Sequence, residues 1–150
     1  MFHAIFERQA RATFELVNQH DYDSILAGAM PDIRHRFSGD HALGGERNDT
    51  KHVRLWFERL QRLIPGLALT VTDVWVIGGL GKTTVIVRWT AAATLLDGLP
   101  YANRGVHVIQ LRNRKIVSID VEEDSQAVVL GLKRQAHSGL TEALAAPITS

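Results

Sequence analysis

In the first 65 residues, apolar side chains recur at steps of three and four, the spacing that places them on one face of a helix. The pattern predicts helices over residues 2–18, 22–30 and 50–64, with a short extended segment over residues 33–37. Asp21 is placed to cap the second helix, and Pro65 followed by Gly66 closes the third. A further helix is expected over residues 125–136.

Beyond Gly66 the apolar positions alternate instead, and β-branched residues become frequent. This pattern predicts four strands, over residues 67–77, 83–95, 101–111 and 115–122. The turns between them are short, so the strands are expected to form an antiparallel meander. Because strands of this length twist, and bend at a glycine such as Gly105, we expect a strongly curved sheet.

This layout predicts an α+β fold in which three to four helices cover the concave face of the curved antiparallel sheet. Strands 83–95 and 101–111 are apolar at both odd and even positions. That pattern is expected when one face lines an interior and a second subunit covers the other. We therefore expect a homodimer that packs through the convex sheet face.

The composition is that of one ordinary globular domain. The chain has 150 residues, of which 45% are hydrophobic and 22% charged, which is enough for a self-sufficient core. We assign residues 1–136 to a single domain. The Ala-rich residues 137–150 are expected to form a weakly ordered C-terminal tail.

Charge and residue usage argue against several classes of function. A formal net charge of +1 gives no basic surface for nucleic acid. The absence of cysteine excludes disulfides, thiolate catalysis and cysteine-bound zinc. Charges interrupt the apolar N-terminus, and no stretch approaches the length of a membrane span. We therefore expect a cytoplasmic protein that binds no membrane.

Two motifs that suggest a phosphate or metal site have simpler explanations. Residues 78–82, GGLGK, are similar to a phosphate-binding loop, but a predicted strand follows where a helix is required, so we interpret them as a hairpin turn. The seven histidines show neither an HExxH motif nor paired i, i+4 spacing. We expect no metal and no cofactor.

Several motifs follow one another along the chain: HRFSGDHALGGER, VRLWFERLQRLIPGL, VIVRWTAAATLLDGLPYANRGVHVIQL and KIVSIDVEED followed by QAVVLGL. With the order of elements, they resemble the SnoaL-like group of small polyketide cyclases within the nuclear-transport-factor-two-like superfamily, over about residues 2–135. This resemblance implies a cone in which helices and the concave sheet enclose an apolar cavity. The superfamily contains cyclases, isomerases, dehydratases, epoxide hydrolases and non-catalytic binders, so the resemblance does not fix a reaction.

Alternation along the strands indicates which side chains share a face. With the parity taken from similar folds, the cavity-facing residues expected on the strands are Arg88, Thr90, Asn103, His107, Ile109, Ile119, Val121 and Glu123. Trp56 on the third helix, and His35 and His41 before it, are expected to complete the pocket for a small apolar molecule.

Four of these residues are candidates for catalysis. His107 or His35 is suited to exchange a proton near neutral pH and so to act as a base. Arg88 as a fixed positive charge and Asn103 as a hydrogen-bond donor would stabilise an enolate or carbonyl oxygen. The simpler interpretation pairs Arg88 with Glu123 or a neighbouring acid and His107 with a backbone carbonyl. The sequence leaves both interpretations open.

One position departs from the pattern of the characterised relatives. Cyclases and epoxide hydrolases of similar fold place an inward acid on the last strand, where this chain has Val121, while Asp120 is expected to face outwards. Unless a shifted register turns Asp120 inwards, a histidine must replace the usual carboxylate base.

The sequence therefore favours a cofactor-independent SnoaL-like enzyme that isomerises, cyclises or dehydrates a small hydrophobic carbonyl compound. The alternative is a non-catalytic ligand-binding or accessory homodimer. A structural module is the third hypothesis, favoured if bulky side chains fill the cavity. The loop over residues 38–49, rich in glycine, is long enough to act as a lid.

Overall fold

The computed structural model describes residues 2–150, in which helices pack on one face of a six-stranded sheet. The helices are α1 (Phe2–Asn18), α2 (Tyr22–Ala27), α3 (Thr50–Leu63), α4 (Ser125–His137) and the short 3-10 helix η1 (Thr141–Leu144). The strands are β1 (Ala29–Phe37), β2 (Gly45–Arg47), β3 (Ala68–Gly78), β4 (Lys82–Thr94), β5 (Pro100–Arg112) and β6 (Lys115–Glu123).

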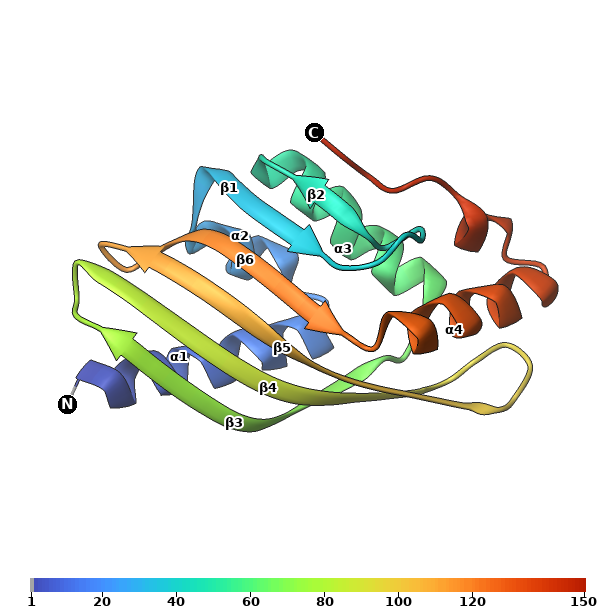
Figure 1. Ribbon diagram of the computed structural model, residues 1–150, viewed down its shortest axis with the longest axis horizontal. Coiled ribbons are helices and arrows are strands. Elements are labelled where there is room, and N and C mark those ends of the chain that lie inside the picture. The colour runs from blue at the N-terminus through green and yellow to red at the C-terminus, as the bar shows by residue number, and fades with distance from the viewer. Residues whose placement is uncertain (1) are drawn as a thin grey trace.

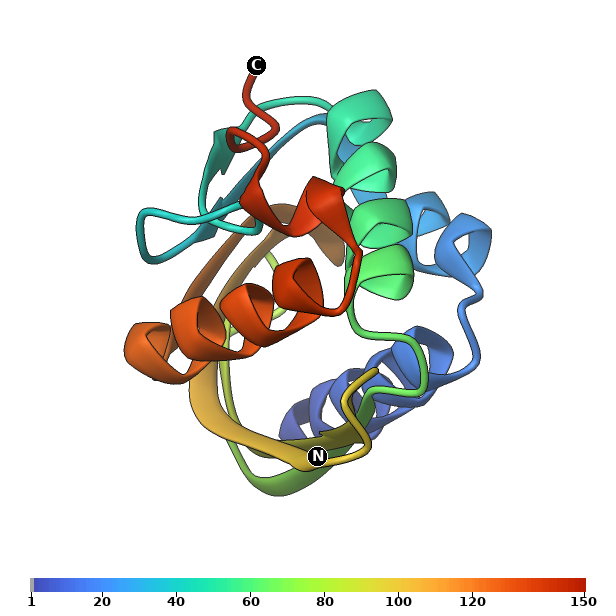
Figure 2. The same ribbon diagram turned by 90° about the vertical axis from the view of Figure 1, so that its right-hand side faces the viewer.

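The strand order in the sheet is β2-β1-β6-β5-β4-β3, with β1 and β6 parallel and the other neighbours antiparallel. The hairpin of β4 and β5 is the longest part of the sheet (Figure 1). The sheet curves around the helices (Figure 2). The predicted α+β fold with a curved sheet is confirmed, and every predicted helix and strand is present, although α2 ends at Ala27 and residues 29–30 belong to β1.

The sequence pattern underestimated the sheet, because β1 and β2 join it as two further strands. In β1 the inward residues Ile33, His35 and Phe37 alternate with charged residues that face outwards. So short and charged a segment has a weak strand signal by itself. Its pairing with β6, some 80 residues later, is a long-range contact that no local pattern can reveal.

The helices close the concave side of the sheet. α1 lies along β3, whereas α2 and α3 pack over β1 (Figures 1 and 2). Phe14 of α1 and Trp56 of α3 are buried, because each points from its helix into the space in front of the sheet. The apolar interior of the fold is therefore built between α1, α3 and the inner faces of the strands.

The C-terminal segment is held in place by hydrogen bonds, which corrects the expectation of a weakly ordered tail. Arg59 donates to the carbonyl oxygen of Ala146 at 2.8 Å, and Asn48 Nδ2 donates to that of Ser150 at 2.9 Å. Ala143 in η1 is buried. The segment therefore packs against α3 and β2, although its Ala-rich composition carries no sign of this.

Gly105 in β5 has a packing role in addition to the bend that its sequence suggested. A β-carbon placed on Gly105 would lie 2.5 Å from Cζ2 of Trp89 and 2.7 Å from the carbonyl oxygen of Glu122. The indole of Trp89 therefore occupies the space that a side chain at position 105 would need. Neither the indole nor the backbone can withdraw without disturbing the sheet.

We expect Gly105→Ala to lower the free energy of unfolding by about 1–3 kcal/mol, the usual cost of overpacking a core. Gly79→Ala is the matched control, because no atom lies within 4 Å of a β-carbon at Gly79. Urea unfolding at pH 7 measures both variants. Equal stability of the two variants would contradict this account of Gly105.

Candidate functional site

An enclosed apolar cavity of about 80 Å³ lies between the concave sheet face and helices α1 and α3. Its lining residues are Thr13, Phe14, Val17, Ile25, His35, Phe37, Leu43, Trp56, Phe57, Leu60, Ile64, Leu67, Leu69, Trp89, Ala91, Tyr101, His107, Ile109, Ile116, Ile119 and Val128. None of these is Asp, Glu, Lys or Arg. The cavity is smaller than the few hundred Å³ typical of small-molecule sites, so a ligand must displace side chains to enter.

His107 is held on β5 by a hydrogen bond from the neighbouring strand. The indole N–H of Trp89 donates to His107 Nδ1 at 2.7 Å. The ring of Phe14 meets the imidazole edge to face at 4.9 Å between centroids. Burial in these apolar surroundings lowers the pKa of His107 to about 3, because the charged form would be poorly solvated. His107 is therefore a neutral imidazole at physiological pH.

His35 has the same character on β1 but a different donor. Its side chain is only 1% exposed, and its ring lies 4.5 Å from that of Trp56. Arg47 Nη1 lies 2.9 Å from His35 Nδ1. Burial, followed by the positive charge of Arg47 and the proximity of His107, lowers the pKa of His35 well below its usual value. His35 is therefore also neutral.

These contacts fix the tautomer of each imidazole. Arginine and tryptophan nitrogens only donate, so Nδ1 of His35 and of His107 must be the acceptor. The proton of each neutral ring then lies on Nε2. Neither Nε2 atom has a hydrogen-bond partner among residues 2–150, and both rings line the cavity. Each histidine thus has a free N–H donor at Nε2, while the lone pair on Nδ1 already accepts a hydrogen bond from Arg47 or Trp89.

Arg88 and Thr90 do not line the cavity, contrary to the predicted parity of β4. Both are exposed on the outer sheet face, where Arg88 pairs with Asp73 at 3.3 Å. The inward positions of β4 are the odd-numbered ones, which include Trp89 and Ala91. Both parities of this strand contain apolar residues, so alternation alone did not decide its orientation. The parity borrowed from similar folds was wrong here.

The parity of β5 and β6 agrees with the prediction. Ile109 and Ile119 line the cavity, whereas Val121, also predicted to line it, is fully buried opposite His107 and is not part of the lining. Asp120 faces the outer side, where it accepts a hydrogen bond from Arg36 at 2.7 Å. Asn103 does not line the cavity; its amide donates to the hydroxyl of Tyr101 at 3.1 Å.

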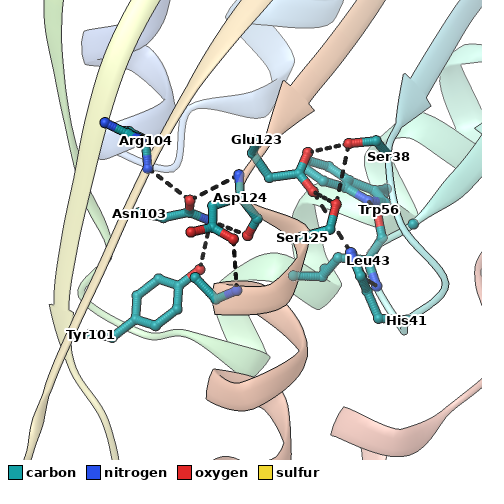
Figure 3. A network of polar contacts seen from close by, with 12 residues as sticks. Ser38, His41, Leu43, Trp56, Tyr101, Asn103, Arg104, Glu123, Asp124 and Ser125 are labelled. Carbon is teal, nitrogen blue, oxygen red and sulfur yellow. Dashed lines mark hydrogen bonds and ion pairs between the residues drawn. The ribbon is translucent and has the colours of Figure 1, made fainter.

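Glu123 and His41, both predicted pocket residues, are not part of the cavity lining and lie with buried side chains in a separate polar cluster (Figure 3). Ser38 and Ser125 donate to the Glu123 carboxylate at 2.8 and 2.9 Å. His41 Nδ1 accepts from the backbone N–H of Leu43, while its Nε2 lies 3.8 Å from the carboxylate. The cluster ties the loop after β1 to the start of α4.

Sequence reasoning missed three residues that shape the site: Trp89, Tyr101 and Arg47. The correct parity of β4 would have identified Trp89, and Tyr101 occupies an inward position of the parity already predicted for β5. Arg47 gave no signal, since it follows a glycine-rich loop in a charged stretch. Its burial depends on segments far apart in the sequence.

Residues 2–150 contain neither a metal-binding cluster nor a membrane-spanning helix. They contain no group of three or more His, Cys, Asp or Glu side chains arranged to hold a metal ion. No helix in this part of the chain has the length and apolarity to cross a membrane.

Comparison of the sequence with family models gives a match to the SnoaL-like domain over residues 10–119. No curated protein sequence matches the chain.

Solved structures share the fold at low sequence identity. An NTF2-like protein of unknown function from Burkholderia pseudomallei has a TM-score of 0.71 and 20% identity over 83% of this chain and 94% of its own. A putative polyketide cyclase from Xanthomonas campestris pv. campestris has a TM-score of 0.59 and 15% identity, covering 87% and 93%. TerC, co-crystallised with polyporic acid, has a TM-score of 0.65 and 22% identity, covering 77% and 88%. These likenesses show a common fold.

The lowered pKa of His107 predicts a loss of stability between pH 7 and pH 5. In this range the unfolded chain binds a proton at position 107 that the folded chain excludes, because the folded pKa is about 3. Acidification to pH 5 should therefore lower the free energy of unfolding by roughly 2 kcal/mol through His107 alone. His35 acts in the same direction.

Urea unfolding at pH 7 and pH 5 measures this loss in the wild type and in His107→Gln. The glutamine cannot titrate, yet its amide oxygen can still accept from Trp89. In His107→Gln we expect a smaller loss of unfolding free energy between pH 7 and pH 5 than in the wild type, because the contribution of His107 is absent. An unchanged loss in this variant would show that His107 titrates normally in the folded protein.

Proposed function

The chain belongs to the SnoaL-like domain family, and on this premise we propose that it binds a small, largely apolar carbonyl compound in the cavity. The proposed reaction is an isomerisation, cyclisation or dehydration of that compound without a cofactor. The observation that carries the proposal is the pair of neutral histidines, His35 and His107, whose rings line a largely apolar cavity that has no charged side chain in its lining.

The chemistry follows from these two donors. A carbonyl oxygen within hydrogen-bond reach of Nε2 of His35 or of His107 would accept a hydrogen bond from that ring. As the compound enolises, negative charge develops on that oxygen and the hydrogen bond strengthens. In an apolar site one such donor contributes about 100-fold or more to the rate. A neutral imidazole suits this role because its N–H donates a hydrogen bond to the oxygen but is too weak an acid to transfer its proton fully.

The predicted role of either histidine as a base is replaced in this proposal by the role of donor. Both Nδ1 lone pairs are occupied, and no carboxylate or lysine lines the cavity. The proposed substrate is therefore one whose α-carbon is already acidic, such as a 1,3-dicarbonyl compound, so that water or the substrate itself can take the proton. Polyporic acid, present in the TerC crystals, is a suitable first probe.

Ligand entry requires the cavity to widen, and the loop after β1 is the proposed lid. Leu43 of this loop lines the cavity, and its carbonyl oxygen accepts a hydrogen bond from the Trp56 indole at 2.7 Å. Withdrawal of the loop would remove Leu43 from the wall and free the indole. The loop is held at its start by the cluster around Glu123.

A non-catalytic ligand-binding protein is the second candidate. The absence of a basic side chain from the cavity lining favours it. Binding and turnover assays on the same compounds distinguish it from the enzyme.

The homodimer is proposed to form through the convex sheet face. Trp75, Ile86 and Val108 lie side by side on neighbouring strands and form an apolar row there. Trp75 is 44% exposed in the single chain. Burial of this row against a second copy would remove apolar surface from water. A cytoplasmic location stays a prediction from the sequence.

The function is tested by titrating the protein with polyporic acid and with 1-phenyl-1,3-butanedione, monitored by tryptophan fluorescence. We expect His107→Phe to weaken binding about tenfold, the effect of one lost hydrogen bond. His107→Gln, which retains an amide donor, should bind more tightly than His107→Phe. Conversion of the same compounds is followed by chromatography.

Binding without conversion of any probe supports the non-catalytic candidate. Binding that is equal in the wild type, His107→Phe and the corresponding His35→Phe variant would refute the role of the two donors.

The dimer is tested by sedimentation velocity at micromolar concentration. Ile86→Arg places a charge within the apolar row and should give a monomer. Lys51→Glu, on the exposed side of α3, is the control and should sediment as the wild type does. A monomeric wild type would exclude the proposed interface.

A further inference from the structure

Arg47 is a completely buried cation that makes no ion pair within residues 2–150. Its exposed fraction is 0%, and no carboxylate of the described chain lies within 4 Å of its guanidinium. Burial, followed by the charge of Arg59, lowers the pKa of Arg47 to about 10, although the nearby Glu46 carboxylate acts in the opposite direction. Arg47 is therefore still charged at neutral pH, in a place where charge is poorly solvated.

Three neutral acceptors surround the guanidinium. Nη1 donates to His35 Nδ1 at 2.9 Å, Nη2 to the carbonyl oxygen of Gly44 at 2.7 Å and Nε to that of Ile148 at 2.9 Å. Trp56 covers the group, with its ring centre 5.7 Å from the guanidinium carbon. The three acceptors belong to β1, to the loop after it and to the C-terminal segment.

A buried charge that makes no direct ion pair is poorly solvated and lowers stability, whereas an apolar side chain of similar size would fill the same space without that penalty. The hydrogen bonds of Arg47 to the carbonyl oxygens of Gly44 and Ile148 do not explain why its Nη1 donates to the imidazole of His35, which lines the cavity. An arginine at this position does have one effect that an apolar residue lacks. Because it can only donate, it excludes a proton from His35 Nδ1.

We propose that Arg47 is a positioning residue that holds His35 as the Nε2–H tautomer, so that its N–H is available to a ligand in the cavity. The consequence for a ligand rests on the function proposed above, but the consequence for the imidazole does not. The positive charge next to Nδ1 also polarises the ring, which makes Nε2–H a stronger donor. The C-terminal segment contributes the Ile148 carbonyl that completes the anchoring of Arg47.

His107 provides an internal reference for this proposal. Its tautomer is set by a neutral donor, the Trp89 indole, and this contact does not involve Arg47. A change at position 47 should therefore alter His35 and leave His107 unaffected. A purely structural role of Arg47 would lower stability without changing the tautomer of His35.

The test is long-range ¹H–¹⁵N NMR of the histidine rings in the full-length protein without ligand. In the wild type, Nδ1 of His35 should be unprotonated and Nε2 protonated. Arg47→Met should give a mixture of both tautomers at His35, and Arg47→Lys should restore the Nε2–H form, because an ammonium group also only donates. Arg62→Met is the matched control, since Arg62 contacts the C-terminal segment through Glu142 but does not line the cavity.

A protonated Nδ1 of His35 in the wild type would overturn the proposal, whatever the variants do. So would a pure Nε2–H form of His35 in folded Arg47→Met. If Arg47→Met does not fold, Arg47→Gln takes its place, because its shorter amide side chain withdraws the fixed donor. Absence of ligand binding in the wild type refutes the proposed function, while the tautomers still decide the role of Arg47.

Discussion

The packing of Trp89 over Gly105 is the contact on which the interior of this protein depends. The pairing of β4 with β5 places Trp89 opposite Gly105, and the missing side chain leaves room for the indole. The indole N–H of Trp89 then donates to His107, which follows Gly105 by two residues in β5. One glycine thus positions an aromatic wall of the cavity and, through it, the orientation and tautomer of an imidazole. The curvature of the sheet brings Phe14 of α1 against the other side of that ring.

Desolvation explains why the cavity contains donors and no charge. In an apolar enclosure the imidazolium form is disfavoured, so both histidines lose their ordinary ability to titrate near neutral pH. Their polarity remains, however, and each ring has one N–H left after its lone pair is used. Such a site is suited to recognise an oxygen that is neutral in the ground state and becomes negative during a reaction. It is poorly suited to remove a proton.

The charged groups of the region are displaced to the margins of the cavity, where other polar atoms satisfy them. Arg47 lies beside His35 and donates to three acceptors. The Glu123 carboxylate accepts from the hydroxyls of Ser38 and Ser125 (Figure 3). Both groups belong to contacts between segments distant in the sequence. They connect the loop after β1 to the C-terminal segment on one side and to α4 on the other. The polar contacts that hold the loop are therefore the same ones that surround the site.

Most of the fold, and part of the site, could be predicted from the sequence. Periodicity located the helices and the four strands of the meander, because amphipathic spacing depends on residues close together in the chain. The inward orientation of His107, Ile109 and Ile119 followed from alternation once the sheet was known to curve around a cavity. The predicted inward orientation of Arg88 and Thr90 was wrong. Apolar residues occur on both faces of β4, and only the packing of α1 determines which face is the inner one.

The properties that matter most for chemistry were decided by the tertiary structure. The sequence by itself determined the fold class, the apolar character of the interior and the presence of histidines near it. The pairing of β1 with β6, the burial of Arg47 beneath the C-terminal segment and the contact of Trp89 with His107 join residues far apart or on different strands. Only these contacts determine which imidazole nitrogen carries the proton. The reason is physical: a tautomer is set by the donor that reaches the ring in three dimensions, and no local pattern of residues contains that information.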